Sequence, residues 1–194
     1  MYKSPSSALT ACQIWLAKRN LDAVIINAKQ NKFGHTGLLS ASGHLFITRT
    51  SQHILVDSRY YHELSAKADS YQLHMTDTQL PASAIINQII AQEKLACVGF
   101  EAEHLSYSQS LSLIEKINAE MSPICLDELR QIKTPSEIDT IKSACLIADC
   151  ACAHIRQYIR PGMTEHQIAN ELEWFMKNEG AEKTSFDTIV ASGV

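Results

Sequence analysis

Two patterns in the sequence carry residue types that could bind a metal ion or transfer a proton. His62-Glu63 begins like the HExxH helix of zinc peptidases, in which two histidines one turn apart bind zinc and the glutamate acts as a base. Ala66 occupies the position of the second histidine, which excludes that motif, so we expect this helix face to be solvated. Glu101 and Glu103 form a carboxylate pair suited to acid–base work. The pattern offers them no third partner, which favours a surface position.

His35 and Arg59 are the two residues whose surroundings favour binding. His35 lies in the glycine-bearing stretch 28–43, which we expect to be a loop, and loops often carry binding residues. Arg59 follows Asp57 and Ser58, either of which can cap a helix, but Arg59 itself has no local role. That favours an ion pair between domains or subunits. The remaining histidines lack a carboxylate at ligand spacing, and we expect those near strand ends to be structural and hydrogen-bonded: His44, His53 and His74.

Composition and charge narrow the class of protein. The chain has 194 residues, of which 45% are hydrophobic and 20% charged, as in an ordinary globular protein. A net charge of -4 gives no reason to expect nucleic acid or an anionic membrane as a partner. No apolar run approaches the ~18 residues of a membrane span. The six cysteines include no CxxC pair, which favours a reduced, cytoplasmic protein.

Hydrophobic periodicity divides the chain into an α/β part and a helical part. Short β-branched runs alternate with helical patterns over the first 127 residues, which predicts a mixed sheet flanked by helices. The predicted strands are 21–27, 44–48, 53–57, 71–75, 95–100 and 122–126, and the predicted helices are 7–19, 58–68, one that opens at Pro81 and one that follows Ser106. After a charged hinge at 127–134, the sequence predicts capped helices over 135–160 and 165–179 and a strand over 186–191.

The second part carries an ordered set of motifs. The run LRQIKTPSEIDTIK, the turn IRPGMTE and the run SFDTIVASG resemble the start of the catalytic domain in the aminopeptidase P, prolidase and creatinase family. The stretches NKFGHTGLL and HILVDSRYY resemble two motifs of that family's N-terminal domain. The resemblance therefore covers nearly the whole chain. It implies a creatinase-like N-terminal domain in residues 1–127 with a mostly six-stranded sheet, and a linker plus the first two helices and first strand of a pita-bread domain in 128–194.

The same resemblance implies a function and its limits. We expect the N-terminal portion of a proline-specific metallopeptidase, an Xaa-Pro aminopeptidase or dipeptidase, that hydrolyses the bond between a first residue and proline. Complete relatives use two divalent metal ions (Mn, Co or Zn), but the positions of their ligands would follow Val194. We therefore expect this chain to hold no metal and no catalytic residue, and to be inactive alone.

Partners and the weaker site residues also follow from the resemblance. It implies a homodimer formed through the N-terminal domain and a proline-containing peptide as substrate of the complete form, with no nucleic acid and no membrane. It assigns a substrate-lid or interface role to four residues: His35, Leu38, Leu39 and Arg59. Gly34, His35 and Leu38 depart from the family's loop pattern. A non-catalytic oligomerisation or peptide-binding module of the same fold and a creatinase-type amidinohydrolase stay open as alternatives.

Overall fold

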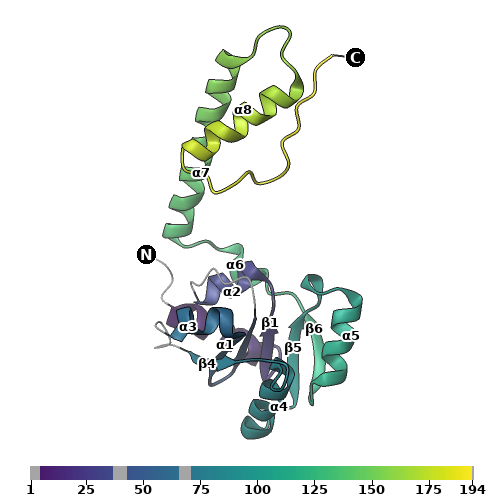
Figure 1. The fold of residues 1–194 in the computed structure, drawn as a ribbon. Helices are drawn as coiled ribbons and strands as arrows, with labels where there is room; N and C mark the ends of the chain where they lie inside the picture. Colours follow the sequence, from purple (N-terminus) through teal and green to yellow (C-terminus); the bar gives the residue numbers. More distant parts are fainter. Residues whose placement is uncertain (1–4, 37–42, 66–70, 194) are drawn as a thin grey trace. The chain divides into compact units, whose positions relative to one another are not determined.

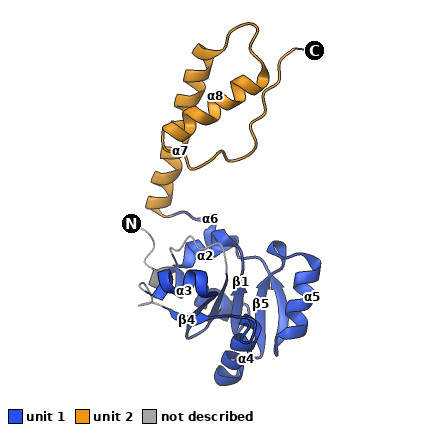
Figure 2. Cartoon of the chain, viewed as in Figure 1, with its two compact units in different colours: residues 1–133 blue, residues 134–194 orange. Residues whose placement is uncertain are grey.

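The computed structural model describes residues 5–36, 43–65 and 71–193 (Figure 1). The chain divides into two compact units, Met1–Lys133 and Thr134–Val194 (Figure 2). Each unit is described by itself below. The assignment of a creatinase-like domain to 1–127 and of a linker with the start of a catalytic domain to 128–194 remains a prediction.

The first unit is built on a six-stranded sheet in the order β4-β3-β2-β1-β5-β6. Strand β2 runs antiparallel to β1 and to β3, whereas β3–β4, β1–β5 and β5–β6 are parallel pairs. This confirms the mixed six-stranded sheet that the sequence predicted. The strands are β1 (Ala23–Ile26), β2 (His44–Thr48), β3 (Gln52–Val56), β4 (Gln72–Met75), β5 (Cys97–Glu101) and β6 (Glu120–Ile124).

Helices cover both faces of this sheet, and the two-residue period of the strands decides which side chain meets which helix. In β1, Val24 and Ile26 join a core cluster with residues of α1 and α3, while Ala23 and Ile25 join a second cluster with α4. Each fully buried aliphatic side chain contributes roughly 1.5–3 kcal/mol, so the two clusters hold the three layers together. The helices are α1 (Pro5–Lys18), α3 (Ser58–Ser65), α4 (Ala82–Glu93) and α5 (Tyr107–Lys116).

The stretch 28–43 differs from the prediction. It was expected to be a loop, but Lys29–Thr36 forms helix α2. The sequence did not predict this helix, because its polar composition and Gly34 leave no apolar stripe of helical period. Tertiary contacts at its first turn, described below, supply the stability that the local sequence lacks. The described residues of the unit also form two shorter elements, the 3-10 turn η2 (Ala102–His104) and helix α6 (Glu128–Gln131).

The second unit pairs two helices that start as predicted. Helix α7 (Pro135–Tyr158) opens with a capping box of Thr134 and Glu137, and α8 (Glu165–Asn178) with one of Thr164 and Gln167. Between the helices, His154 of α7 contacts α8 through a 2.7 Å hydrogen bond between its Nε2 and the carboxylate of Glu171 and through a stacked Phe175 ring. None of the described helices combines the length and apolar character that crossing a bilayer needs.

The predicted strand over 186–191 is not formed. These residues follow α8 back along its length: the Thr188 hydroxyl donates to Glu173, and the Ser192 amide donates to Glu165. A strand is defined by ladder hydrogen bonds with a neighbour, and among the described residues no such neighbour pairs with this segment. Phe186 and Ile189 are 80% and 86% exposed as a result.

Candidate functional site

A buried carboxylate lies at the carboxyl ends of β1 and β5, two parallel strands in the interior of the first unit's sheet. Glu101, the last residue of β5, is 1% exposed. Its Oε2 accepts hydrogen bonds from the backbone amides of Asn27 at 2.6 Å and Ala28 at 2.8 Å, and its Oε1 accepts from the side-chain amide of Asn31. Since β1 and β5 are parallel neighbours, the residues that follow β1 come directly to this carboxylate. Glu101 therefore anchors the start of α2, where the helix dipole favours a negative charge.

Helix α2 in turn brings polar side chains into the same buried region. Asn31, Lys32 and His35 are 2%, 7% and 6% exposed. The Lys32 ammonium donates to the carbonyl of Gly43 at 2.9 Å. Burial lowers the pKa of Lys32, and the charge of Glu101 opposes that shift. The opposite charges of Lys32 and Glu101 therefore offset part of the cost of burying the ammonium group.

Helix α6 closes the cluster from its other side. The Arg130 guanidinium donates to the side-chain oxygen of Asn31 at 3.3 Å. The aliphatic part of Arg130 covers Gly34, where a Cβ atom would lie 3.7 Å from it. Arg130, Asn31 and Glu101 therefore link α6, α2 and β5. Both oxygens of Glu101 accept from protein donors, so this cluster positions α2 and does not present a free base or a metal ligand.

The residues predicted from the sequence fall in different places. His35 is buried in α2, not in a loop as expected. Leu38 and Leu39 lie outside the described residues. Arg59 has a local partner that the sequence analysis missed, since its guanidinium pairs with Asp57 at 2.7 Å, and its side chain is 72% exposed. An interface or lid role for these four positions remains a prediction.

The expectation that Glu101 lies at the surface was wrong. The residue was grouped with Glu103 by its spacing of two, but the chain turns into η2 immediately after Glu101, so the two carboxylates do not share a strand face. One feature of the sequence could have indicated the buried position: Glu101 ends an apolar strand. A carboxylate there can accept hydrogen bonds from the backbone amides that follow the neighbouring parallel strand and begin the next helix. His62 and Glu63 are exposed on α3, as predicted.

The three strand histidines are hydrogen-bonded, as predicted. His44 Nδ1 pairs with the Asn27 side chain. His53 lies in the sheet between Ser51 and His74, with its Nε2 2.7 Å from the serine hydroxyl and its Nδ1 3.0 Å from His74 Nε2. Burial, and next the neighbouring His74, lowers the pKa of His53 to about 4. His53 is therefore neutral at pH 7 and acts as a structural link between β3 and β4.

Potential metal ligands converge at one point among the described residues. Ligand atoms of Glu103, Cys125 and Asp127 lie within 4.8 Å of one another, and all three residues are exposed. No such group of three occurs within the described part of the second unit, 134–193.

Comparison with known proteins gives the architecture a context. Residues 9–132 match the family model of the creatinase/prolidase N-terminal domain, and residues 139–194 match that of metallopeptidase family M24. The chain is 31% identical over 186 residues to the Xaa-Pro dipeptidase of Pyrococcus horikoshii, covering 92% of this chain and 50% of that protein. It is 45% identical over 92 residues to the Xaa-Pro dipeptidase of Pyrococcus furiosus, covering 46% and 26%.

Solved structures show the same relationship. The Xaa-Pro dipeptidase from Bacillus anthracis superimposes with a TM-score of 0.87 at 28% identity, over 95% of this chain and 52% of that one. The X-Pro aminopeptidase from Thermotoga maritima gives 0.74 at 26% identity, over 88% and 51%. The chain thus spans about half the length of the relatives it matches. From the sheet, the ordered motifs and these matches together, the chain belongs to the aminopeptidase P, prolidase and creatinase family, with that family's N-terminal domain in residues 9–132.

Proposed function

We propose that this chain is the N-terminal portion of a proline-specific metallopeptidase that hydrolyses the bond between a first residue and proline. One observation carries the proposal: a creatinase/prolidase N-terminal match at 9–132 is followed in the same chain by an M24 metallopeptidase match at 139–194. Two relatives that are similar to nearly the whole chain are named Xaa-Pro dipeptidase, and they are about twice as long.

The hydrogen bonds of the first unit favour a structural role for two of its buried titratable groups. The Glu101 carboxylate accepts hydrogen bonds at the start of α2, and His53 lies between Ser51 and His74. Neither group is available to a substrate. These two groups are therefore structural, and we assign the metal ligands of the whole protein to other sequence. In the family, two divalent ions would activate a water and polarise the scissile carbonyl.

Hydrolysis by two forms of the protein tests the proposal. Purified 194-residue chain and the gene product that extends beyond Val194 are incubated with Mn²⁺, Co²⁺ or Zn²⁺ and either the dipeptide Ala-Pro or the tripeptide Ala-Pro-Ala. We expect the extended product to cleave a peptide only with metal, and the 194-residue chain to cleave neither. Cleavage of the dipeptide alone indicates a dipeptidase, and cleavage of the tripeptide indicates an aminopeptidase.

The same assay separates the alternatives. An extended product that binds two divalent ions but cleaves creatine instead of either peptide is an amidinohydrolase. One that binds no metal and cleaves none of the three overturns the enzymatic proposal and leaves a non-catalytic module. Cleavage by the 194-residue chain at the rate of the extended product would refute the proposal that the metal ligands lie outside the 194 residues.

We further propose that the protein works as a homodimer in the cytoplasm. All six cysteines are free thiols, which supports a reducing compartment. Arg59 is exposed at a helix start and could add an intersubunit contact to its Asp57 pair. Light scattering of the chain should give twice the monomer mass, and fractionation should place the protein with cytoplasmic markers. A monomer at all concentrations, or a membrane fraction, would contradict these two proposals.

A further inference from the structure

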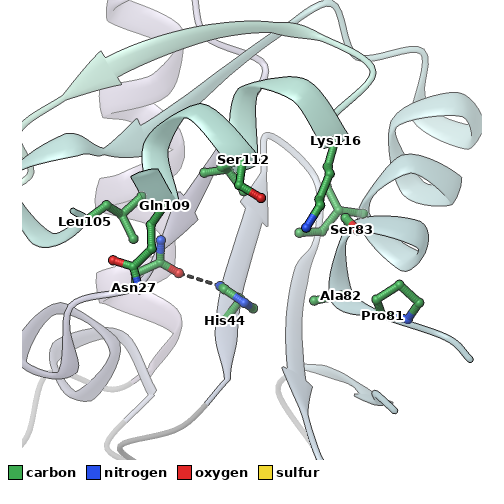
Figure 3. A pocket seen from close by; sticks show the side chains of 11 residues that line it. Asn27, His44, Pro81, Ala82, Ser83, Leu105, Gln109, Ser112 and Lys116 are labelled. Atoms are coloured by element: carbon green, nitrogen blue, oxygen red, sulfur yellow. Dashed lines mark hydrogen bonds between the residues drawn. The ribbon is translucent and has the colours of Figure 1, made fainter. Parts of the chain in front are cut away.

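A cavity of about 310 Å³ opens between α4 and α5 on one face of the first unit's sheet. It adjoins the buried cluster at Glu101, because Asn27, one of its lining residues, donates its backbone amide to that carboxylate. Residues that follow β1 and begin β2 form its inner end (Figure 3). Its volume lies at the lower end of the range of small-molecule sites, roughly 300–1,000 Å³. All of its lining residues are described by the structure.

The inner end of the cavity offers one hydrogen-bond donor and one acceptor. The Asn27 side-chain oxygen accepts from His44 Nδ1, and the amide nitrogen of Asn27 is buried without a hydrogen-bond partner among the described residues. Burial, and next the charge of Lys32, lowers the pKa of His44, so the ring is neutral at pH 7. Because Nδ1 carries the proton in this pair, Nε2 keeps a lone pair that can accept. A buried amide donor left unpaired costs about 1–3 kcal/mol, which favours a ligand that accepts from it.

The outer part of the cavity is electropositive. Lys116, at the end of α5, extends its ammonium group toward Ser83 in the first turn of α4 (Figure 3). That helix has Pro81 at its N-cap, with no side-chain hydrogen bond to cap its amides. Helix N-termini attract anions, and no carboxylate lines the cavity. An anionic group is therefore favoured between Lys116 and the start of α4.

Apolar side chains form the remaining wall. Ile86 of α4, Leu105 at the end of η2 and Leu113 of α5 line the cavity. They can bury an aliphatic group, while the Ser112 hydroxyl adds a polar contact on the same side. The polar inner end, the positive outer part and the apolar wall together fit one kind of ligand. It has an anionic end, a neutral group that both donates and accepts hydrogen bonds, and a compact hydrocarbon part.

We propose that this cavity binds a small organic carboxylate that carries an amide and an aliphatic group, such as an N-acylated aliphatic amino acid. The carboxylate would lie between Lys116 and the first turn of α4. The amide carbonyl would accept from Asn27, and the amide N–H would donate to His44 Nε2. The proposal does not depend on peptidase activity, since it uses only side chains of the first unit.

Calorimetric titration of the 194-residue chain with N-acetyl-L-leucine tests the site. The uncharged N-acetyl-L-leucinamide and sodium 4-methylpentanoate, which has the same hydrocarbon chain without the acetamido group, are the matched probes. We expect N-acetyl-L-leucine to bind about tenfold more tightly than either, since the first probe lacks the charge and the second lacks the amide. Equal affinity for N-acetyl-L-leucinamide would overturn the anionic part, and equal affinity for 4-methylpentanoate would overturn the amide part.

Two charge-removing variants locate the binding. Lys116→Gln should weaken binding of N-acetyl-L-leucine about tenfold, whereas Lys18→Gln, the same change at an exposed position in α1, should leave it unchanged. The side-chain amide resonance of Asn27 should shift on titration in ¹⁵N NMR spectra. Absence of heat and of that shift at millimolar probe overturns the proposal, and so does an equal loss of affinity in both variants, because attraction would then be non-specific.

Discussion

Replacing Glu101 by glutamine should destabilise the first unit although the two side chains have nearly the same shape. A glutamine with its oxygen in the Oε2 position still accepts from the amides of Asn27 and Ala28. Its NH₂ group then faces the NH₂ group of Asn31, and two donors cannot bond to each other. Turning the Asn31 amide over restores that bond but presents NH₂ to the Arg130 guanidinium, which now donates to its oxygen.

The cost can be built up from these contacts. Charge assistance is lost on two backbone hydrogen bonds, at about 1 kcal/mol each, and either the Asn31 or the Arg130 bond is lost at about 1 kcal/mol. We therefore expect Glu101→Gln to lower the free energy of unfolding by ~3 kcal/mol, which for a unit of this size lowers Tm by about 10 °C. Glu115→Gln, at an exposed position of α5, is the matched control and should change stability by less than about 0.5 kcal/mol.

Urea denaturation followed by tryptophan fluorescence measures the loss in the correct unit. Trp15 is buried at 5% exposure in the first unit, while Trp174 is 59% exposed in the second, so a Trp174→Phe background leaves Trp15 as the reporter. Adding Arg130→Met to Glu101→Gln should cost less than the sum of the two changes, because Asn31 is then free to turn. A Glu101→Gln midpoint equal to that of Glu115→Gln, or strict additivity with Arg130→Met, would refute the hydrogen-bond argument.

Three further predictions concern pH, thiol chemistry and proteolysis. Because the unfolded chain binds a proton at His53 near pH 6.5 and the folded chain only near pH 4, the free energy of unfolding should fall by roughly 3 kcal/mol as pH drops through this window. His53→Gln should flatten that dependence, whereas the exposed His62→Gln should not. Burial raises the pKa of Cys12 to about 12, so in a variant that keeps Cys12 alone Ellman's reagent should react only at the rate of unfolding, whereas a variant that keeps only the exposed Cys145 should react at once. Limited proteolysis should remove the part beyond Thr134 first, because α7 buries only Ala151 and leaves Leu146 exposed, and Trp174 of α8 is exposed as well. Hydrogen exchange that protects α7 as well as β1 would contradict this.

The sequence predicted the strands and the long helices because their information is local. Alternation and β-branched runs indicated all six strands of the sheet, within a few residues of their observed ends. Capping boxes placed the starts of α5, α7 and α8 at Ser106, Thr134 and Thr164. A capping box satisfies orphan amides with side chains three residues away, so nothing distant is needed to recognise it.

Two errors in the prediction had a common cause. The strand expected over 186–191 has the right composition, but no strand in the described part of the chain pairs with it. Helix α2 has an unfavourable composition, but Asn31 in its first turn donates a hydrogen bond to Glu101. These two residues are 70 positions apart in the sequence. In both cases a contact between distant segments outweighs local propensity.

The same reasoning explains why candidate sites were the hardest part to predict. A carboxylate's role depends on which donors reach it, and those donors come from other elements. Glu101 and Glu103 are identical in type and two residues apart, yet the first anchors a helix from inside the core and the second is exposed. What separates them is the parallel pairing of β1 with β5, which delivers the amides of Asn27 and Ala28 to Glu101 alone. Once that pairing is known, the buried position of Glu101 follows from the need of the first turn of α2 for an acceptor.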